Sequence, residues 1–156
     1  MNVGNNQMGP DGLMALIGGL MGNPTTTSID LSGNVMNPAA AAMLGKVLAS
    51  NHVLETLVLN NCELGNAGVI ALCNRLSMNR SLKNLSLESN NISDAGALAL
   101  SKALSVNQTL QSLDLDNNKI SPAGGGIFAS LFVKTQMGGG TPQGPSSWAR
   151  HAASLL

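Results

Sequence analysis

The chain has 156 residues, of which 44% are hydrophobic and 10% are charged, and its eight basic and eight acidic residues give a formal net charge of zero. This length predicts a single domain, and the balanced charge gives no sign of binding to nucleic acid or to a membrane surface. Aromatic residues make up 2% of the chain, too few for a platform on which bases could stack. The two cysteines, Cys62 and Cys73, make neither a disulfide framework nor a metal site.

A motif of the form L-x-x-L-x-L-x-x-N-x-L recurs every 28 residues without insertion or deletion. Its copies begin at Thr26, Leu54, Leu82 and Leu110. Counting back one more period places Met1, Val3 and Asn6 at equivalent positions, so the chain opens inside a predicted strand. A period of this length is typical of a solenoid, in which each unit buries its apolar face only by stacking on its neighbours.

Each copy predicts a short strand followed by an amphipathic helix. The alternating leucines of the motif point inward, and the residues between them point out from the sheet. Two helical columns four residues apart share the buried face; they read Leu16, Leu44, Leu72, Leu100, Phe128 and Leu20, Leu48, Leu76, Leu104, Phe132. A column of small residues precedes them, and we expect it to let the helix lie close to the strand layer: Gly12, Ala40, Gly68, Gly96 and Gly124.

Polar residues mark the ends of the predicted helices. Capping side chains followed by favoured first-turn residues predict helix starts at Asn37-Pro38, Ser93-Asp94 and Ser121-Pro122. Asparagines that tolerate the left-handed conformation predict the helix ends; they are Asn23, Asn51, Asn79 and Asn107.

A further asparagine column, Asn34, Asn90 and Asn118, lies where each strand turns toward its helix. A buried asparagine at such a turn can satisfy backbone groups of adjacent turns. Cys62 stands in this column in one repeat, and we interpret its thiol as structural.

These columns together resemble the leucine-rich repeat family, and the 28-residue unit with a full helix is similar to its ribonuclease-inhibitor-like subclass. That subclass includes the repeat domains of NOD-like receptors, Ran GTPase-activating proteins and tropomodulins. The resemblance implies an α/β horseshoe of β-α repeats, with a parallel sheet on the concave side and helices on the convex side. It says little about function, because repeats of this kind host many unrelated binding roles.

We expect three segments along the chain. Residues 1–134 form the repeat domain, with about five repeats of which the first is truncated. Residues 135–147 are rich in Gly, Pro and Ser and predict a flexible linker. Residues 148–156 form a tail, which as a short helix would place Trp148, Ala152 and Leu155 on one face. That tail is either a docking peptide or lid on the final repeat, or a frayed end or sequence past a frame or splice boundary, which we favour.

No polar capping unit precedes the first repeat, although terminal repeats usually need one. The chain is either a fragment of a longer array, which we favour, or a short protein whose exposed edge is covered by a partner. Self-association through the first repeat is one way to cover that edge. Residues 13–21 are apolar, but no Lys or Arg occurs before Lys46, so they do not predict a signal peptide. The glycosylation sequons at Asn79 and Asn107 arise from the repeat itself. We therefore expect an intracellular, cytoplasmic protein with no membrane-spanning segment.

The outward strand positions are the candidate partner-binding residues. One column reads Asp30, Val58, Ser86 and Asp114, and the next reads Ser32, Asn60, Glu88 and Asp116. These columns hold acids and no base, whereas the predicted helices carry Lys46, Arg75 and Lys102. Because residues one period apart lie on adjacent strands, ~4.8 Å apart, we expect a concave face that attracts a basic or hydrogen-bond-donating protein segment. The alternative is a solvated face whose acids keep the sheet soluble.

The sequence shows no catalytic constellation, and we predict neither an enzyme nor a bound cofactor or metal. The glycine runs 124–126 and 138–140 lack the Lys and Ser/Thr of a phosphate loop. The predicted function is a protein–protein interaction module, free-standing or part of a larger receptor or scaffold. The alternatives are a regulator similar to GTPase-activating proteins and an actin filament capping factor similar to tropomodulin.

Overall fold

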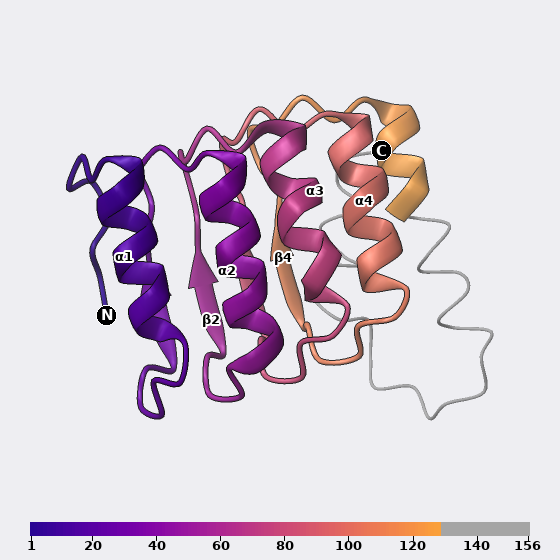
Figure 1. The fold of residues 1–156 in the computed structure, drawn as a ribbon. Helices are drawn as coiled ribbons and strands as arrows, with labels where there is room; N and C mark the ends of the chain where they lie inside the picture. The colour runs from indigo at the N-terminus through magenta and orange to yellow at the C-terminus, as the bar shows by residue number, and fades with distance from the viewer. Residues whose placement is uncertain (129–156) are drawn as a thin grey trace.

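The computed structural model describes residues 1–128, which form a layer of strands and a layer of helices (Figure 1). The elements alternate as α1 (Pro10–Leu20), β1 (Ser28–Asp30), α2 (Pro38–Ser50), β2 (Thr56–Val58), α3 (Gly65–Leu76), β3 (Asn84–Ser86), α4 (Asp94–Leu104) and β4 (Ser112–Asp114). Residues 122–128 form a further helical segment. The expected linker at 135–147, the tail at 148–156 and Phe132 lie outside the described residues.

The strands form one parallel sheet in the order β1-β2-β3-β4. The register pairs residues one period apart, as Ile29 with Leu57 and Leu57 with Leu85 show. The first residues of the chain extend this sheet, because Asn2 forms a parallel bridge with Asp30. The predicted parallel sheet with a 28-residue register is therefore confirmed.

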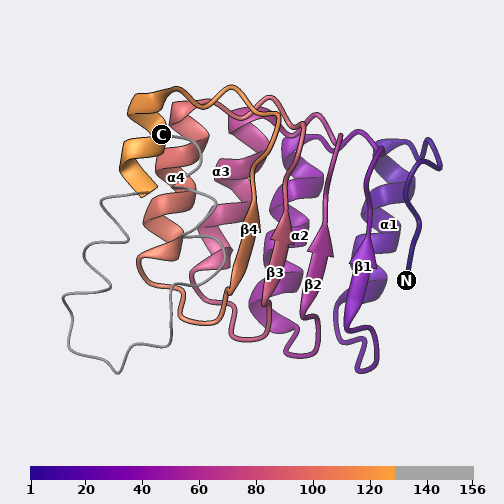
Figure 2. The same ribbon diagram turned by 180° about the vertical axis from the view of Figure 1, so that it is seen from behind.

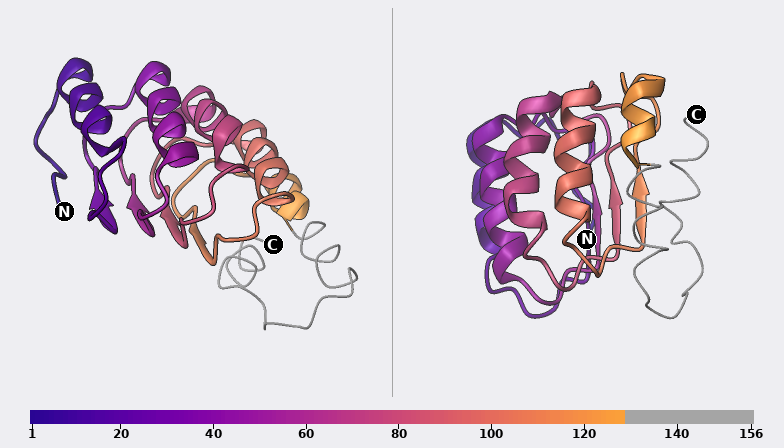
Figure 3. Two further views of the ribbon diagram at one scale, coloured as in Figure 1. Left: turned by 60° about the horizontal axis from the view of Figure 1, so that its bottom comes forward. Right: turned by 90° about the vertical axis from the view of Figure 1, so that its right-hand side faces the viewer.

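The helices lie side by side on one face of the sheet, and no other element of residues 1–128 covers the opposite, open face (Figure 2). Figure 3 shows that the stack bends, with the strand layer on the inside of the curve and the helix layer on the outside. The bend follows from the shapes of the two layers, because packed helices need about 8–10 Å each whereas paired strands need ~4.8 Å. The concave strand face and the convex helix face that the resemblance implies are both present.

The core lies between the two layers and is built from the predicted columns. Ile29, Leu57, Leu85 and Leu113 of the strands are 0 to 5% exposed. Leu44, Leu72 and Leu100 of the helices are fully buried, and Phe128 is 1% exposed. Leu16, the first member of that helical column, is only half-buried, because no repeat packs on the outer side of α1.

The column of small residues is present, but the expected reason for it was wrong. A Cβ on Gly96 would lie 2.6 Å from Ile92 Cγ2 and 2.8 Å from Asn66 Oδ1. The glycine thus makes room for the start of the preceding helix and for the loop before its own helix, and not for the strand layer. Gly124 is equivalent, since its added Cβ would meet the Asp94 carboxylate.

The three predicted helix starts are confirmed, but only two of the three capping bonds are present. Gly124 N donates to Ser121 Oγ at 3.4 Å, as predicted. Asn37 Oδ1 accepts a hydrogen bond of 2.8 Å from Ala40 N, as predicted. Ser93 makes no such bond at the start of α4. Asn66 of the preceding repeat replaces it, because its Oδ1 accepts from Ser93 N and Gly96 N and its Nδ2 donates to Ser93 Oγ. The first turns of adjacent helices are therefore linked directly.

The prediction of left-handed asparagines at the helix ends was wrong. Asn51 is extended, with φ −86° and ψ 126°. Its Oδ1 accepts from Val53 N and Leu54 N, while its Nδ2 donates to Leu20 O of the preceding repeat. The side-chain amide thus closes the turn, and the backbone needs no left-handed residue there. The left-handed column lies instead after the strands, at Asn5, Gly33, Asn61, Ser89 and Asn117.

The asparagine column at the strand-to-helix turn acts as predicted. Asn90 is fully buried, its Oδ1 accepts from Cys62 N and Leu64 N, and its Nδ2 donates to Leu59 O at 2.6 Å. Asn118 repeats this pattern toward Asn90 and Ile92. Each asparagine therefore ties its own repeat to the one before it.

Candidate functional site

The candidate residues lie on the open face of the sheet. Ile29, Leu57, Leu85 and Leu113 point into the core, so the strand residues beside them point away from it. All the predicted site residues are half-buried except Asp116, which is exposed: Asp30, Ser32, Val58, Asn60, Ser86, Glu88, Asp114 and Asp116. The structure thus places them together on one face, in two columns across β1 to β4 (Figure 2).

Ser86 is the centre of a polar network that joins three repeats. Its Oγ lies 2.7 Å from Asn60 Oδ1 and 3.1 Å from Asp114 Oδ2. Asn60 Oδ1 also accepts from Glu88 N at 3.1 Å. Asp114 Oδ1 accepts from Asp116 N at 3.0 Å, and the single hydroxyl proton of Ser86 is donated either to Asp114 Oδ2 or to Asn60 Oδ1. These contacts fix the direction in which the Asp114 carboxylate points.

Glu88 is held in a similar way by side-chain amides. Asn117 Nδ2 donates to Glu88 Oε1 at 2.9 Å, and Asn60 Nδ2 lies 3.5 Å from Glu88 Oε2. Both donors are neutral, so the carboxylate is oriented while its charge stays uncompensated by them. The same holds for the contact of Asp114 with Ser86. The C-terminal half of the concave face therefore presents two ordered carboxylates.

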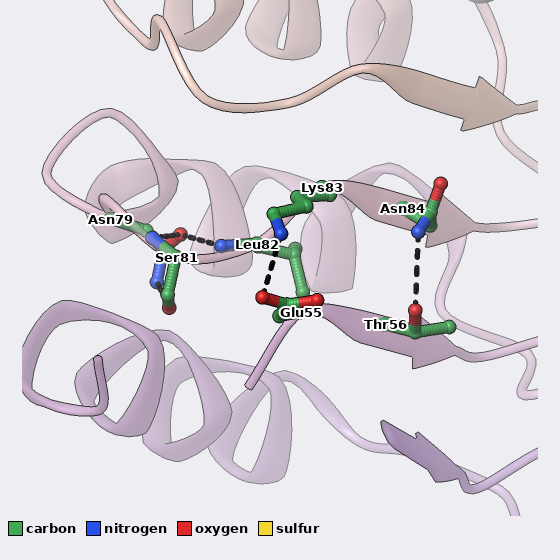
Figure 4. A network of polar contacts seen from close by, with 7 residues as sticks. All are labelled: Glu55, Thr56, Asn79, Ser81, Leu82, Lys83 and Asn84. Atoms are coloured by element: carbon green, nitrogen blue, oxygen red, sulfur yellow. Dashed lines mark hydrogen bonds and ion pairs between the residues drawn. The ribbon is translucent and has the colours of Figure 1, made fainter. Parts of the chain in front are cut away.

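An ion pair that the sequence analysis missed lies just before the strands (Figure 4). Lys83 Nζ is 2.7 Å from Glu55 Oε1, and the two side chains are 43% and 47% exposed. Beside it, Asn84 Nδ2 donates to Thr56 Oγ1 at 3.2 Å. The signal was present in the sequence, because residues 55 and 83 are one period apart and oppositely charged. The charge of Lys83 is thus matched by an acid outside the two candidate columns.

The cysteines and His52 are not functional groups of this face. Cys62 is fully buried, and its Sγ lies 3.5 Å from Leu31 O. Burial raises the pKa of Cys62 to about 11 and that of Cys73 to about 12. Both thiols stay protonated at neutral pH, which agrees with the structural role predicted for Cys62. His52 is exposed.

Within residues 1–128 no three His, Cys, Asp or Glu residues are grouped so that they could hold a metal ion. None of the helices described there has the length and apolar character needed to cross a membrane.

The family model described as "Leucine Rich repeat" matches residues 2–16, 50–73, 79–101 and 106–126, which is more than half of the chain. The chain belongs to the leucine-rich repeat family. Its 28-residue β-α units fit the ribonuclease-inhibitor-like subclass, and the repeat domain is a protein-interaction module. No curated protein matches the chain.

Two solved structures resemble this leucine-rich repeat protein in fold. One is described as "Leiomodin-1 Actin-Binding Site 2"; it has a TM-score of 0.67 and 22% identity, over 78% of this chain and 71% of that one. The other is the tropomodulin C-terminal domain of Caenorhabditis elegans, with a TM-score of 0.68 and 16% identity, over 91% of this chain and 89% of that one. At these identities the likeness concerns the fold alone.

Proposed function

We propose that this leucine-rich repeat protein binds a protein partner through its concave strand face and selects a basic or hydrogen-bond-donating segment there. The observation that supports this most is the arrangement of Glu88 and Asp114. Neutral groups of Ser86, Asn60 and Asn117 orient both carboxylates, and the two candidate columns contain no base. The carboxylates are thereby ordered before a partner arrives, which lowers the entropy lost on binding.

Charge on this face contributes mainly to the rate and selectivity of binding. An exposed ion pair contributes only about 0–1 kcal/mol, so no single carboxylate here determines affinity. Several acids on neighbouring strands act together, attract a basic segment and disfavour an acidic one. Half-buried Val58 adds an apolar contact between the two ends of the face.

The test compares two charge reversals of equal size in the full chain. Glu88→Lys with Asp114→Lys changes the candidate face, and Asp11→Lys with Glu63→Lys changes exposed acids elsewhere. The probe is a labelled arginine-rich peptide without apolar residues, measured by fluorescence anisotropy at low and high salt. We expect the first variant to weaken binding about tenfold at low salt and the second to leave it nearly unchanged. Equal losses in both variants would contradict the proposal.

Actin is the second candidate partner, because the printed description of one similar structure names an actin-binding site. A capping role similar to that of tropomodulin is the corresponding function. The assay is elongation of actin filaments from seeds with the full chain and with the Glu88→Lys, Asp114→Lys variant. Slower elongation with the wild type but not with the variant supports this candidate. The GTPase-regulator alternative has no matching residue in the chain and is tested by a GTPase-stimulation assay.

We also propose that the chain acts by binding and not by catalysis, in an intracellular compartment. Two buried cysteines without a disulfide suit a reducing environment.

Self-association through the first repeat belongs to the same proposal. Met1 is 55% exposed, and Val3, Met8 and Leu16 are half-buried, although their equivalents in the next repeat are buried. Sedimentation of the wild type and of Leu16→Lys tests this surface, and a monomeric wild type at all concentrations would contradict it.

A further inference from the structure

Apolar side chains are exposed on the convex face in pairs that are one period apart. Ile70 in α3 and Leu98 in α4 are each 42% exposed. Met78 and Val106, two residues after the ends of these helices, are 54% and 55% exposed. Single exposed apolar residues are common on protein surfaces, but here the same two positions are apolar in two adjacent repeats.

These four residues form one surface across neighbouring helices, which we name the convex apolar patch. The spacing of four places Ile70 and Asn74 along one side of α3, and Met78 continues this line two residues beyond the end of the helix. Leu98, Lys102 and Val106 follow the same course along α4, which lies beside α3 (Figure 1). The two apolar pairs are thus separated by about 12 Å along the helix direction, or slightly more than two turns. Exposed Asn74 and Lys102 lie between them.

The exposed charged side chains of α2, α3 and α4, the helices that carry and adjoin the convex apolar patch, are all basic. Lys46 on α2, Arg75 on α3 and Lys102 on α4 are all exposed. The acids of the described helices are Asp11 on the distant α1 and Asp94, whose carboxylate is bonded to Ser121 at the opposite end of α4. A second copy of the chain would bring bases against bases at this surface. The complementary partner is therefore acidic.

We propose that the convex apolar patch docks an acidic amphipathic helix of a partner protein. Two leucines seven or eight residues apart on that helix would contact the pair Ile70 and Leu98 and the pair Met78 and Val106. Glutamates between and beside them would face Lys102 and Arg75. The surface is on the opposite layer from Glu88 and Asp114, so this inference is independent of the proposed concave function.

The probe is a labelled peptide of about 16 residues, long enough to form a helix, with two leucine clusters two turns apart and glutamates elsewhere. The test variant is Ile70→Glu with Leu98→Glu in the full chain. The matched control is Met21→Glu with Val35→Glu, which also removes two exposed apolar residues, 49% and 52% exposed, and adds the same charge. Circular dichroism of each variant verifies that the fold is kept.

We expect the patch variant to weaken peptide binding at least about tenfold, while the control and the Glu88→Lys, Asp114→Lys variant bind within about twofold of the wild type. Lys102→Glu should weaken binding by a smaller factor. No binding to the wild type, or equal losses in patch variant and control, would overturn the inference. The inference would also be overturned if the wild type bound phosphatidylserine vesicles but not the peptide, since the surface would then be a membrane contact.

Discussion

The turns of this protein and the open face of its sheet are built on the same 28-residue period but behave differently. Each of the four described helix-to-strand turns has an asparagine, Asn23, Asn51, Asn79 and Asn107, and every one of these side chains bonds at least one backbone group. On the concave face one column changes from Asp30 to Val58, Ser86 and Asp114. A turn presents the same backbone groups at the same positions in each repeat, whereas a binding partner does not present the same groups to each repeat. The information about binding therefore lies in the columns that vary.

The largest expected effect comes from breaking a turn. Asn90→Ala leaves Cys62 N, Leu64 N and Leu59 O without their side-chain partner in a buried turn. Each unsatisfied group costs about 1–3 kcal/mol, so we expect the free energy of unfolding to fall by about 3–5 kcal/mol. Urea denaturation followed by circular dichroism measures the loss.

Ser86→Ala is the matched change on the open face. Its partners Asn60 and Asp114 are half-buried and reach water, so the free energy of unfolding should change by no more than about 0.5 kcal/mol. A similar loss in both variants would remove the distinction between turn and open face.

The second-largest effect comes from replacing glycine by alanine. This change should alter the free energy of unfolding in opposite directions at two equivalent positions. A Cβ on Gly96 would meet Asn66 Oδ1 and displace the cap of α4, so Gly96→Ala should lower the free energy of unfolding by about 1–2 kcal/mol. Gly12 has the same position in α1, and its added Cβ would meet nothing closer than 4.0 Å. Gly12→Ala should therefore raise the free energy of unfolding by about 0.5–1 kcal/mol. Stabilisation by both changes in urea denaturation would show that the cap is unimportant.

These results also explain how far the sequence could predict the molecule. The inward columns and the sheet register followed from the period, because every inward position must be apolar in every repeat. Asn66, Asp94 and Lys83 were missed as linking residues, because their own columns change from repeat to repeat. Pro38 stands one period before Asn66, and Glu55 stands one period before Lys83. The left-handed column was hidden for a related reason, since Ser89 interrupts its run of Asn and Gly. The candidate face could be located from alternation alone, but the donors that orient Glu88 could not.

A third prediction concerns the exposed pair of Lys83 and Glu55. Both side chains are nearly half exposed, so water and salt screen their attraction. A double-mutant cycle with Lys83→Ala and Glu55→Ala should give a coupling free energy of about 0.2–1 kcal/mol that decreases at high salt. A coupling that exceeds the loss measured for Asn90→Ala, or that is insensitive to salt, would place this pair among the structural contacts.

The smallest expected effect is a pH dependence at the last described turn. Hydrogen bonds from the Ser121 hydroxyl and backbone N–H hold the pKa of the Asp94 carboxyl below its ordinary value. Because the folded pKa is the lower one, the carboxylate stabilises the fold above that ordinary value, and this stabilisation is lost as the pH falls through the folded pKa. Asp94→Asn should keep the turn at neutral pH, since Asn66 makes the equivalent bonds to Ser93 in the preceding repeat.

The measurement is urea denaturation of wild type and Asp94→Asn between neutral pH and pH of about 3. We expect the difference in free energy of unfolding between the two proteins to be constant near neutral pH. As the pH falls, the wild type should lose stability relative to the variant. A difference that does not depend on pH would mean that the Ser121 bonds form equally well to a protonated carboxyl. The turn would then be held by geometry alone, as the turns closed by asparagine are.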